Sequence, residues 1–522
     1  MRGPAAPDTF TLEIVEAALT AAADEMFAVL RRTAMSPIIY EVLDVGTGLT
    51  DAAGNLISSG AGIPTFVGVL DKAVRHIAGR FAGDIADGDI FLTNDPYHGA
   101  VTHLNDAVVA QPVFAGGAPV AWAASIAHWS DIGGRVAGSM AVDATDIHQE
   151  GLRLPAVKLF DRGRPVTPVL ELIRANSRLP DILAGDLWAQ VAAGRRGAAR
   201  IAEVVQRHGR AAYDAALQRA FDRAAGRAAA GLAALPPRRY RIAEEQDHGP
   251  VWRAAIAVAP DRFTVDLTEA PDQSDGPWNT SRDGAVIAAQ MIFKALTDPS
   301  RQANAGSYRA LEVLTRPGSV FHAREPAPHG YYFETRIRLF DLLWRCLAEA
   351  MPERLPAGHF ASICGTVLAG RHADSGRAYT MVEPQQGGWG ATAARDGLDA
   401  MFSASHGETY NCPVEIAEAR YGHLVGRKTL RADAAAGGTG RRGGCGVETL
   451  LRLRAPATLS VGYGRTRVPV WPLAGGAPGG VNGVGITPGG QAQERLLAFA
   501  SGVALQPGDE VRLFTAQGGG HG

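Results

Sequence analysis

The sequence predicts an α+β fold in which an N-terminal mixed α/β lobe, residues 1–235, is followed by a C-terminal β-rich lobe, residues 236–522. Apolar residues recur at helical spacing near the N-terminus and again over residues 168–234, and β-type runs lie between these segments. After Pro236 and Pro237, short β-type runs alternate with glycine-rich turns. The length of 522 residues exceeds that of most single domains, and 46% hydrophobic with 20% charged residues is typical of a globular protein.

The first lobe is expected to begin with a helix over residues 12–29. A strand pair should flank the turn at residues 51–55, and a second amphipathic helix should run from Pro64 to Phe81. Residues 89–93 are typical of a short strand. The apolar positions that predict the first helix are Leu12, Val15, Leu19, Ala22, Met26 and Val29.

Residues 107–127 contain no charged side chain and are long enough to cross a bilayer. Pro112 and the turn-forming residues 116–119 interrupt this run, so it predicts a β-hairpin and no membrane span. If the turn is centred on Gly117, residues whose numbers sum to about 234 lie opposite one another in the antiparallel pair. Asp106 should therefore face His128.

A helical layer over residues 168–234 is predicted to end at the two prolines, and only a few helices are expected after them, notably around residues 285–296. Three glycine-rich stretches follow. None fits the GxxxxGK[ST] phosphate loop, and we interpret them as tight β turns. These stretches are residues 437–446, 475–490 and 518–522.

The charge balance and the cysteines restrict the possible partners and compartment. The 51 basic and 53 acidic residues nearly cancel and form no basic stripe, so nucleic acid is not an expected partner. The four cysteines form no CxxC pair, which argues against a disulfide framework or a thiolate zinc site. The first residues lack a signal-peptide pattern. We therefore expect a cytoplasmic protein with no membrane partner.

The polar residues at the two ends of the predicted hairpin suggest a metal site. His103 lies three residues before Asp106, on the segment that enters the first strand, and Asp106 faces His128. Two imidazoles and a carboxylate suit Zn, Mn or Fe, and they leave coordination positions open for water or substrate. The alternative is that these are unrelated hydrogen-bonding groups at a strand end, because an HxxD pattern is short and recurs by chance.

A series of motifs, in this order and spacing, resembles the signature of the hydantoinase B/oxoprolinase family. The resemblance covers nearly the whole chain. The segments that carry it are Asn94–Tyr97, Thr102–Asp106, Ala127–Gly134, Ala137–Met140, Ile147–Pro155, Gly185–Gln190, Gln273–Asn279, Gly387–Ala391, Asn411–Glu415 and Pro507–Val511.

The resemblance implies a B-type subunit that works in a hetero-oligomer with an A-type subunit, which binds ATP and phosphorylates a substrate carbonyl oxygen. The absence of a phosphate loop agrees with this division. The implied activity is ATP-dependent hydrolysis of a small cyclic amide, such as a hydantoin, 5-oxoproline or a lactam. The implied ligands of the divalent metal are His103, Asp106 and His128, with Asp44 as the fourth.

Several alternatives stay open at this point. Asp131, His148 and Glu150 could support the site or contact substrate, but structural hydrogen bonds explain such loop residues equally well. Trp129 stands where the family often has a histidine, and it either packs in the core or contacts substrate. Related subunits occur in acetone and acetophenone carboxylases, although those chains are typically longer, and a metal-stabilised scaffold for the partner is a third possibility. No catalytic residue is indicated.

Overall fold

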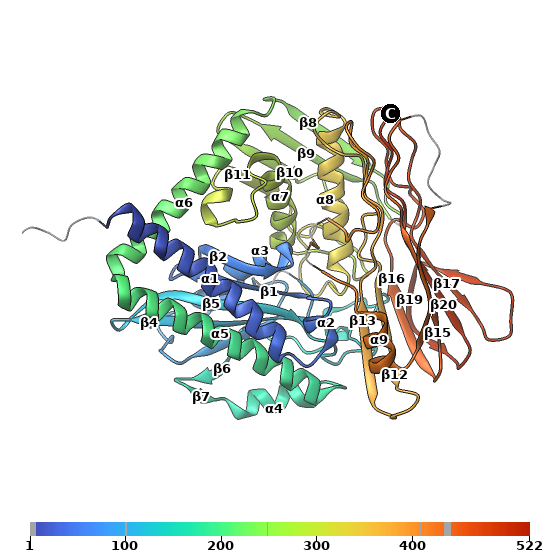
Figure 1. Cartoon of the computed structure of the whole chain (residues 1–522), viewed down its shortest axis with the longest axis horizontal. Helices are drawn as coiled ribbons and strands as arrows, with labels where there is room; N and C mark the ends of the chain where they lie inside the picture. Colours follow the sequence, from blue (N-terminus) through green and yellow to red (C-terminus); the bar gives the residue numbers. More distant parts are fainter. Residues whose placement is uncertain (1–6, 100–101, 248, 405, 408, 433–439) are drawn as a thin grey trace, which may run out of the picture.

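The computed structural model describes residues 7–99, 102–247, 249–404, 406–407, 409–432 and 440–522. Its largest sheet is antiparallel throughout and has the strand order β2-β1-β5-β4-β3-β6-β7. The hairpin strands β4 and β5 lie at its centre, so both are paired on each side (Figure 1). The strands are β1 (Val45–Asp51), β2 (Leu56–Gly62), β3 (Ile90–Thr93), β4 (Asp106–Ala115), β5 (Ala118–His128), β6 (Val157–Asp161) and β7 (Arg164–Pro165).

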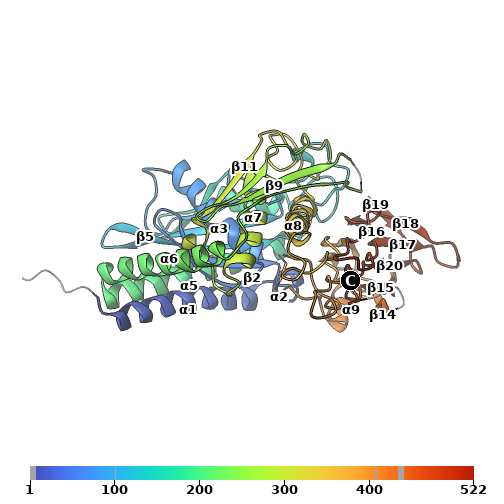
Figure 2. The ribbon, with the colours of Figure 1, turned by 90° about the horizontal axis from the view of Figure 1, so that it is seen from above.

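Helices cover both faces of this sheet. Figure 2 shows α1, α5 and α6 side by side along one side of the molecule, where α1 and α5 contact the sheet. Helix α3 packs against the other face. Val108, Trp122 and Ile126 of the hairpin belong to the same buried apolar cluster as the apolar residues of α3. The helices of this half are α1 (Thr9–Thr33), α2 (Pro37–Tyr40), α3 (Pro64–Arg80), the 3-10 helix η1 (Ile147–Gln149), α4 (Thr167–Ala175), α5 (Pro180–His208) and α6 (Arg210–Ala233).

The register of the central hairpin agrees with the sequence prediction. Asp106 pairs with His128 and Val113 with Ala121, and both pairs sum to 234. A bulge then shifts the pairing by one residue before the turn at Gly116 and Gly117. The two polar residues therefore end the paired region on the side away from the turn.

A second sheet of four strands follows α6, with the order β11-β10-β9-β8. Helix α7 was expected from the sequence, but α8 was not. Figure 1 shows α8 between this sheet and the C-terminal strands. The elements are β8 (Arg239–Glu244), β9 (Trp252–Val258), β10 (Phe263–Leu267), α7 (Arg282–Thr297), the 3-10 helix η2 (Ala305–Tyr308), β11 (Leu311–Thr315) and α8 (Tyr332–Ala348).

The C-terminal residues form two further sheets, with the orders β13-β12-β16-β19 and β14-β15-β20-β17-β18. They gather at one end of the molecule (Figure 1). Their elements are β12 (Gly365–Arg371), β13 (Ala378–Glu383), α9 (Val414–Tyr421), β14 (Leu424–Leu430), β15 (Val447–Arg452), β16 (Ala457–Gly462), β17 (Gly483–Thr487), β18 (Arg495–Leu497), β19 (Phe499–Leu505) and β20 (Glu510–Phe514).

The fold class is confirmed as a mixture of helices and several antiparallel sheets. The division at residue 235 coincides with the change from α6 to β8. One apolar cluster nevertheless contains residues from both sides of it, including Met26 of α1 and Leu459 of β16. The assignment of 1–235 and 236–522 as separate lobes stays a prediction.

The glycine-rich stretches differ from the expectation of tight turns. Gly475 and Gly490 do have positive φ angles, as turn residues often do. At Gly443 and Gly518, however, a Cβ atom would lie 1.8 and 2.0 Å from a neighbouring backbone oxygen. These glycines allow backbone segments to pack directly against one another. Residues 437–439 lie outside the described part of the chain.

Two other expectations concern the whole chain. Among the described helices, none combines the length and the apolar character that a membrane span needs. The four cysteines are buried and unpaired.

Candidate metal centre

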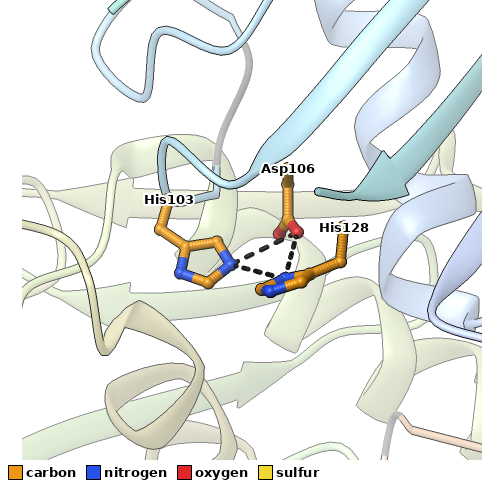
Figure 3. Close-up of side chains that lie close together, drawn as sticks. All are labelled: His103, Asp106 and His128. Atoms are coloured by element: carbon orange, nitrogen blue, oxygen red, sulfur yellow. Dashed lines mark hydrogen bonds and ion pairs between the residues drawn. The ribbon is translucent and has the colours of Figure 1, made fainter. Parts of the chain in front are cut away.

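Three side chains converge at the open end of the central hairpin (Figure 3). His103 Nε2 lies 3.2 Å from His128 Nδ1 and 3.2 Å from Asp106 Oδ1, and His128 Nδ1 lies 3.1 Å from the same oxygen. All three residues are buried. One nitrogen or oxygen atom from each therefore faces a common point.

The local backbone explains this convergence. Asp106 and His128 are the first and last residues of neighbouring strands, and they pair directly. The Asp106 amide donates to the His103 carbonyl oxygen at 3.1 Å, which closes a turn that folds His103 back over the strand end. The i, i+3 spacing of His103 and Asp106 thus brings both side chains to His128.

The separations match those of ligands around one ion. Metal–N and metal–O bonds of about 2.0–2.2 Å place adjacent ligand atoms about 2.8–3.1 Å apart at octahedral angles and about 3.3–3.6 Å apart at tetrahedral angles, so about 2.8–3.6 Å overall. The three observed distances lie in that range. A hydrogen-bonded cluster without metal has similar distances, so the orientation of the His103 ring is the more specific feature.

The hydrogen bond to the second nitrogen of His103 fixes its tautomer. Nδ1 lies 2.9 Å from the carbonyl oxygen of Gly330, which only accepts hydrogen bonds. Nδ1 must therefore carry the proton in the neutral ring, and Nε2 presents a lone pair to the cluster. This arrangement, in which the outer nitrogen donates to a carbonyl, is typical of metal-binding histidines.

Asp44 lies beside the three ligands but is not part of the close group. It precedes β1, and its carbonyl oxygen accepts the His128 amide at 3.1 Å. Its Oδ2 is 3.9 Å from His128 Nδ1, and its buried Oδ1 has no hydrogen-bond partner among the described residues. The preceding residue, Leu43, has a φ of 63°, an uncommon conformation for a bulky side chain.

The electrostatics of the cluster depend on burial and on the two carboxylates. Burial alone would raise the pKa of Asp106, but the charge and hydrogen bonds of His103 and His128 outweigh burial and lower it. Burial lowers the pKa of His128. Burial and the nearby charge of Asp106 raise the pKa of Asp44 well above its usual value. A cation between these groups would offset the repulsion between the two carboxylates.

A small cavity of about 40 Å³ adjoins the ligands. Three polar residues in its wall were not identified from the sequence: Tyr332, Glu383 and His406. The Tyr332 hydroxyl donates to Asp106 Oδ2 at 3.3 Å. Burial raises the pKa of Glu383 to about 7 and lowers that of His406 to about 3. They come from segments more than 200 residues after the hairpin, and no spacing in the sequence connects them to it.

The three further candidates occupy different places. Glu150 is buried, and its carboxylate accepts the backbone amides of His329 and Gly330 at 2.9 and 2.6 Å. Asp131 is also buried, and its carboxylate accepts backbone amides within the loop after β5. His148 is exposed on η1 and is not among the described residues that line the cavity.

Trp129 is fully buried and belongs to the apolar cluster between the sheet and α5. Its indole Nε1 donates to Gln190 Oε1 at 2.9 Å. It is not among the described residues of the cavity wall, and the structure places it in the packed core.

The comparison with known families agrees with the motif series. The family model described as hydantoinase B/oxoprolinase matches residues 8–522. The chain belongs to the hydantoinase B/oxoprolinase family. The resemblance carried by the motifs is therefore confirmed over nearly the whole chain.

Three relatives of this hydantoinase B/oxoprolinase protein are informative. It is 30% identical to the beta chain of caprolactamase from Pseudomonas jessenii, over 99% of this chain and 91% of that protein. It is 28% identical to the B chain of a putative D-/L-hydantoinase from Pseudomonas sp. (strain NS671), over 99% and 90%. The solved ATP-dependent caprolactamase of P. jessenii has the same fold, with a TM-score of 0.90 at 28% identity over 99% of this chain and 91% of that chain.

Acetone carboxylase, in its nucleotide-free structure, also shares the fold. The TM-score is 0.88 at 18% identity, and the match covers 99% of this chain and 76% of that chain. At this level of identity the likeness concerns the fold alone.

Proposed function

We propose that this chain is the metal-carrying subunit of an ATP-dependent cyclic-amide hydrolase and acts with an A-type, ATP-binding subunit. The observation that carries the proposal is the buried group of His103, Asp106 and His128, whose ligand atoms all lie within 4.8 Å of one another. The family membership supports it, as does the similarity to the beta chain of caprolactamase and to the B chain of a putative hydantoinase.

In this proposal the partner transfers the γ-phosphoryl group of ATP to the amide oxygen of the substrate. A first water then adds to the activated carbon, and the C–N bond breaks as the ring nitrogen takes up a proton, which leaves an acyl phosphate. A second water hydrolyses this acyl phosphate to the free acid and phosphate. His103, Asp106 and His128 would hold a Zn, Mn or Fe ion, with Asp44 as the fourth ligand. Such an ion supplies Lewis acidity and lowers the pKa of water near neutral pH.

The residues around the ligands prepare this site. The Gly330 carbonyl keeps the His103 lone pair directed inward, and the Tyr332 hydroxyl bonds the outer oxygen of Asp106. Both contacts restrict how the ligands rotate. The apolar side chains of Phe66 and Phe333 in the cavity wall limit the water around the reacting amide.

The experiment is reconstitution with a cognate A-type subunit. Ring opening of caprolactam, hydantoin and 5-oxoproline is measured together with ADP release, for each protein by itself and for the mixture. We expect ATP hydrolysis that depends on the amide only in the mixture. Amide-dependent ATP turnover by this chain alone would contradict the two-subunit proposal.

A ketone carboxylase component is the second candidate, because part of the chain is 26% identical to the delta subunit of acetophenone carboxylase from Aromatoleum aromaticum, over 45% of this chain and 35% of that protein. The same mixture should then consume ATP with a small ketone and bicarbonate and incorporate labelled carbonate into an acid. If the mixture hydrolyses cyclic amides and incorporates no labelled carbonate, the hydrolase is supported and the carboxylase is excluded.

A further inference from the structure

The segment that leads into α8 connects a buried carboxylate to the candidate metal ligands. The Glu150 carboxylate accepts the His329 amide through Oε2 at 2.9 Å and the Gly330 amide through Oε1 at 2.6 Å. The carbonyl oxygen of the same Gly330 accepts the Nδ1 hydrogen of His103 at 2.9 Å. The backbone of Gly330 therefore connects Glu150 to His103, one of the candidate metal ligands.

Glu150 is placed unusually for a carboxylate. It is 1% exposed, and among the described residues it forms no ion pair. Leaving a carboxylate buried without a cation is costly unless hydrogen bonds compensate it. Burial raises its pKa to about 7 in spite of the two amide bonds. A neutral carbonyl oxygen would also accept these two amides, so folding by itself does not explain why a carboxylate stands at this position.

The fit between Glu150 and Gly330 is close. A Cβ atom on residue 330 would lie 2.8 Å from Glu150 Oε1, so a side chain there would displace one or the other. Other bonds hold the neighbouring backbone, since the Ile147 amide donates to Pro326 and the Tyr331 amide to Pro277. Among the described residues, only Glu150 accepts the consecutive amides of His329 and Gly330, which come just before the Gly330 carbonyl.

We propose that Glu150 is a positioning residue, which orients His103 for metal binding by fixing the Gly330 carbonyl oxygen. This inference rests on the metal site of the proposed function. Rotation of the His103 ring about its Cβ–Cγ bond would carry Nε2 away from the cluster, and the hydrogen bond from Nδ1 to Gly330 opposes that rotation. Such supporting groups change metal affinity by roughly 10- to 100-fold when they are removed.

The test is metal binding by the full-length variant Glu150→Gln. The glutamine keeps the shape but places an NH₂ group against one of the two backbone amides. Binding of Co²⁺ alone is followed by its visible absorption bands, and Zn²⁺ affinity is then measured by displacement of Co²⁺. We expect Zn²⁺ affinity to fall roughly 10- to 100-fold and the Co²⁺ bands to change in position.

Glu334 provides a matched control. It is also buried, its carboxylate accepts the amides of Ile363 and Gly464 at 2.8 and 3.0 Å, and burial raises its pKa to about 7. None of these bonds reaches His103. Glu334→Gln should therefore perturb folding to a similar extent and leave the Zn²⁺ affinity and the Co²⁺ bands unchanged.

The outcomes separate the inference from the proposed function. Equal Zn²⁺ affinity in Glu150→Gln and Glu334→Gln, whether reduced or not, would overturn the positioning role. If the wild-type chain binds neither Co²⁺ nor Zn²⁺, the metal site itself is refuted and the inference with it. If Glu150→Gln does not fold, Gly330→Ala replaces it as the test. The new Cβ would lie 2.8 Å from Glu150 Oε1 and should displace the Gly330 carbonyl. Unchanged metal binding in that variant overturns the proposal.

Discussion

Replacement of His128 by alanine gives the most direct test of the candidate metal centre. The wild-type chain is expected to be stabilised by added metal, because an ion bound only to the folded state shifts the unfolding equilibrium. At a free metal concentration of 100 times Kd this stabilisation is about 2.7 kcal/mol. His128→Ala removes the residue whose Nδ1 lies within 3.2 Å of both other ligands, so the stabilisation should vanish.

The size of the effect follows from the length of the chain. An unfolding entropy of about 2.1 cal/mol/K per residue converts this free energy into a rise in Tm of about 2–3 °C for a protein of this length. Scanning calorimetry with and without Zn²⁺ measures the shift, and elemental analysis of the purified proteins measures the bound metal.

His359 supplies a control for the loss of a buried imidazole. Its Nδ1 lies 3.2 Å from Asp341 Oδ1, which resembles the 3.1 Å pair of His128 and Asp106, but it is not in the group of three ligands. Each alanine variant should lose about 2–5 kcal/mol of stability from the cavity it leaves. Only His128→Ala should lose the metal. Stoichiometric metal and a full Tm shift in His128→Ala would refute the site.

Three other predictions concern the fourth ligand, a buried carboxyl group and a close glycine contact. Asp44→Ala should weaken Zn²⁺ binding by more than the roughly 10- to 100-fold loss typical of supporting groups, as measured by competition with a chelator; a loss within that range would make Asp44 a supporting group, and an unchanged affinity would identify it as a bystander. The pKa of Glu334 is raised from 4.5 to about 7 on folding. The protonated carboxyl group therefore contributes fully to the free energy of unfolding below about pH 4.5, and this contribution is lost as the pH rises towards 7. The loss is about 3 kcal/mol, and denaturant titrations from pH 4.5 to 8 should show a weaker pH dependence in Glu334→Gln; equal slopes would refute the shift. Gly518→Ala should unfold at lower denaturant than Gly226→Ala, because its Cβ would lie 2.0 Å from a backbone oxygen of Trp389 whereas nothing lies within 4 Å at Gly226 in α6; equal midpoints would contradict the close packing.

The hairpin and the proximity of His103, Asp106 and His128 could be predicted from the sequence because both depend on local rules. The turn at Gly116 and Gly117 fixes the register, and the register places Asp106 opposite His128. The spacing of His103 from Asp106 needs only one backbone turn. Distant parts of the chain have no part in these contacts.

The opposite wall of the cavity could not be predicted in the same way. Tyr332, Glu383 and His406 reach it through the packing of α8 and the C-terminal sheets against the hairpin end. Helix α8 was not expected from the sequence, although its apolar residues recur at helical spacing. Residues on nearly all of its faces are buried, including the charged Arg336 and Arg338, and this complete burial depends on distant parts of the chain.

The turn prediction holds at Gly475 and Gly490, but part of the glycine-rich stretches could not be predicted, for a related reason. A glycine in a turn and a glycine against a neighbouring backbone look the same in one sequence. At Gly443 and Gly518 the requirement comes from a segment distant in the chain, and only the three-dimensional contact distinguishes the two cases.

The depth of the three ligands has a consequence for the biogenesis of the protein. His103, Asp106 and His128 are between 0% and 3% exposed, so an ion held by them, as proposed, would enter or leave only when the hairpin end opens. Exchange in the finished protein would then be slow compared with folding. The ion present while α8 closes over the hairpin would stay there, and the metal supply of the cell during synthesis, more than the equilibrium preferences of the ligands, would decide which element the protein carries.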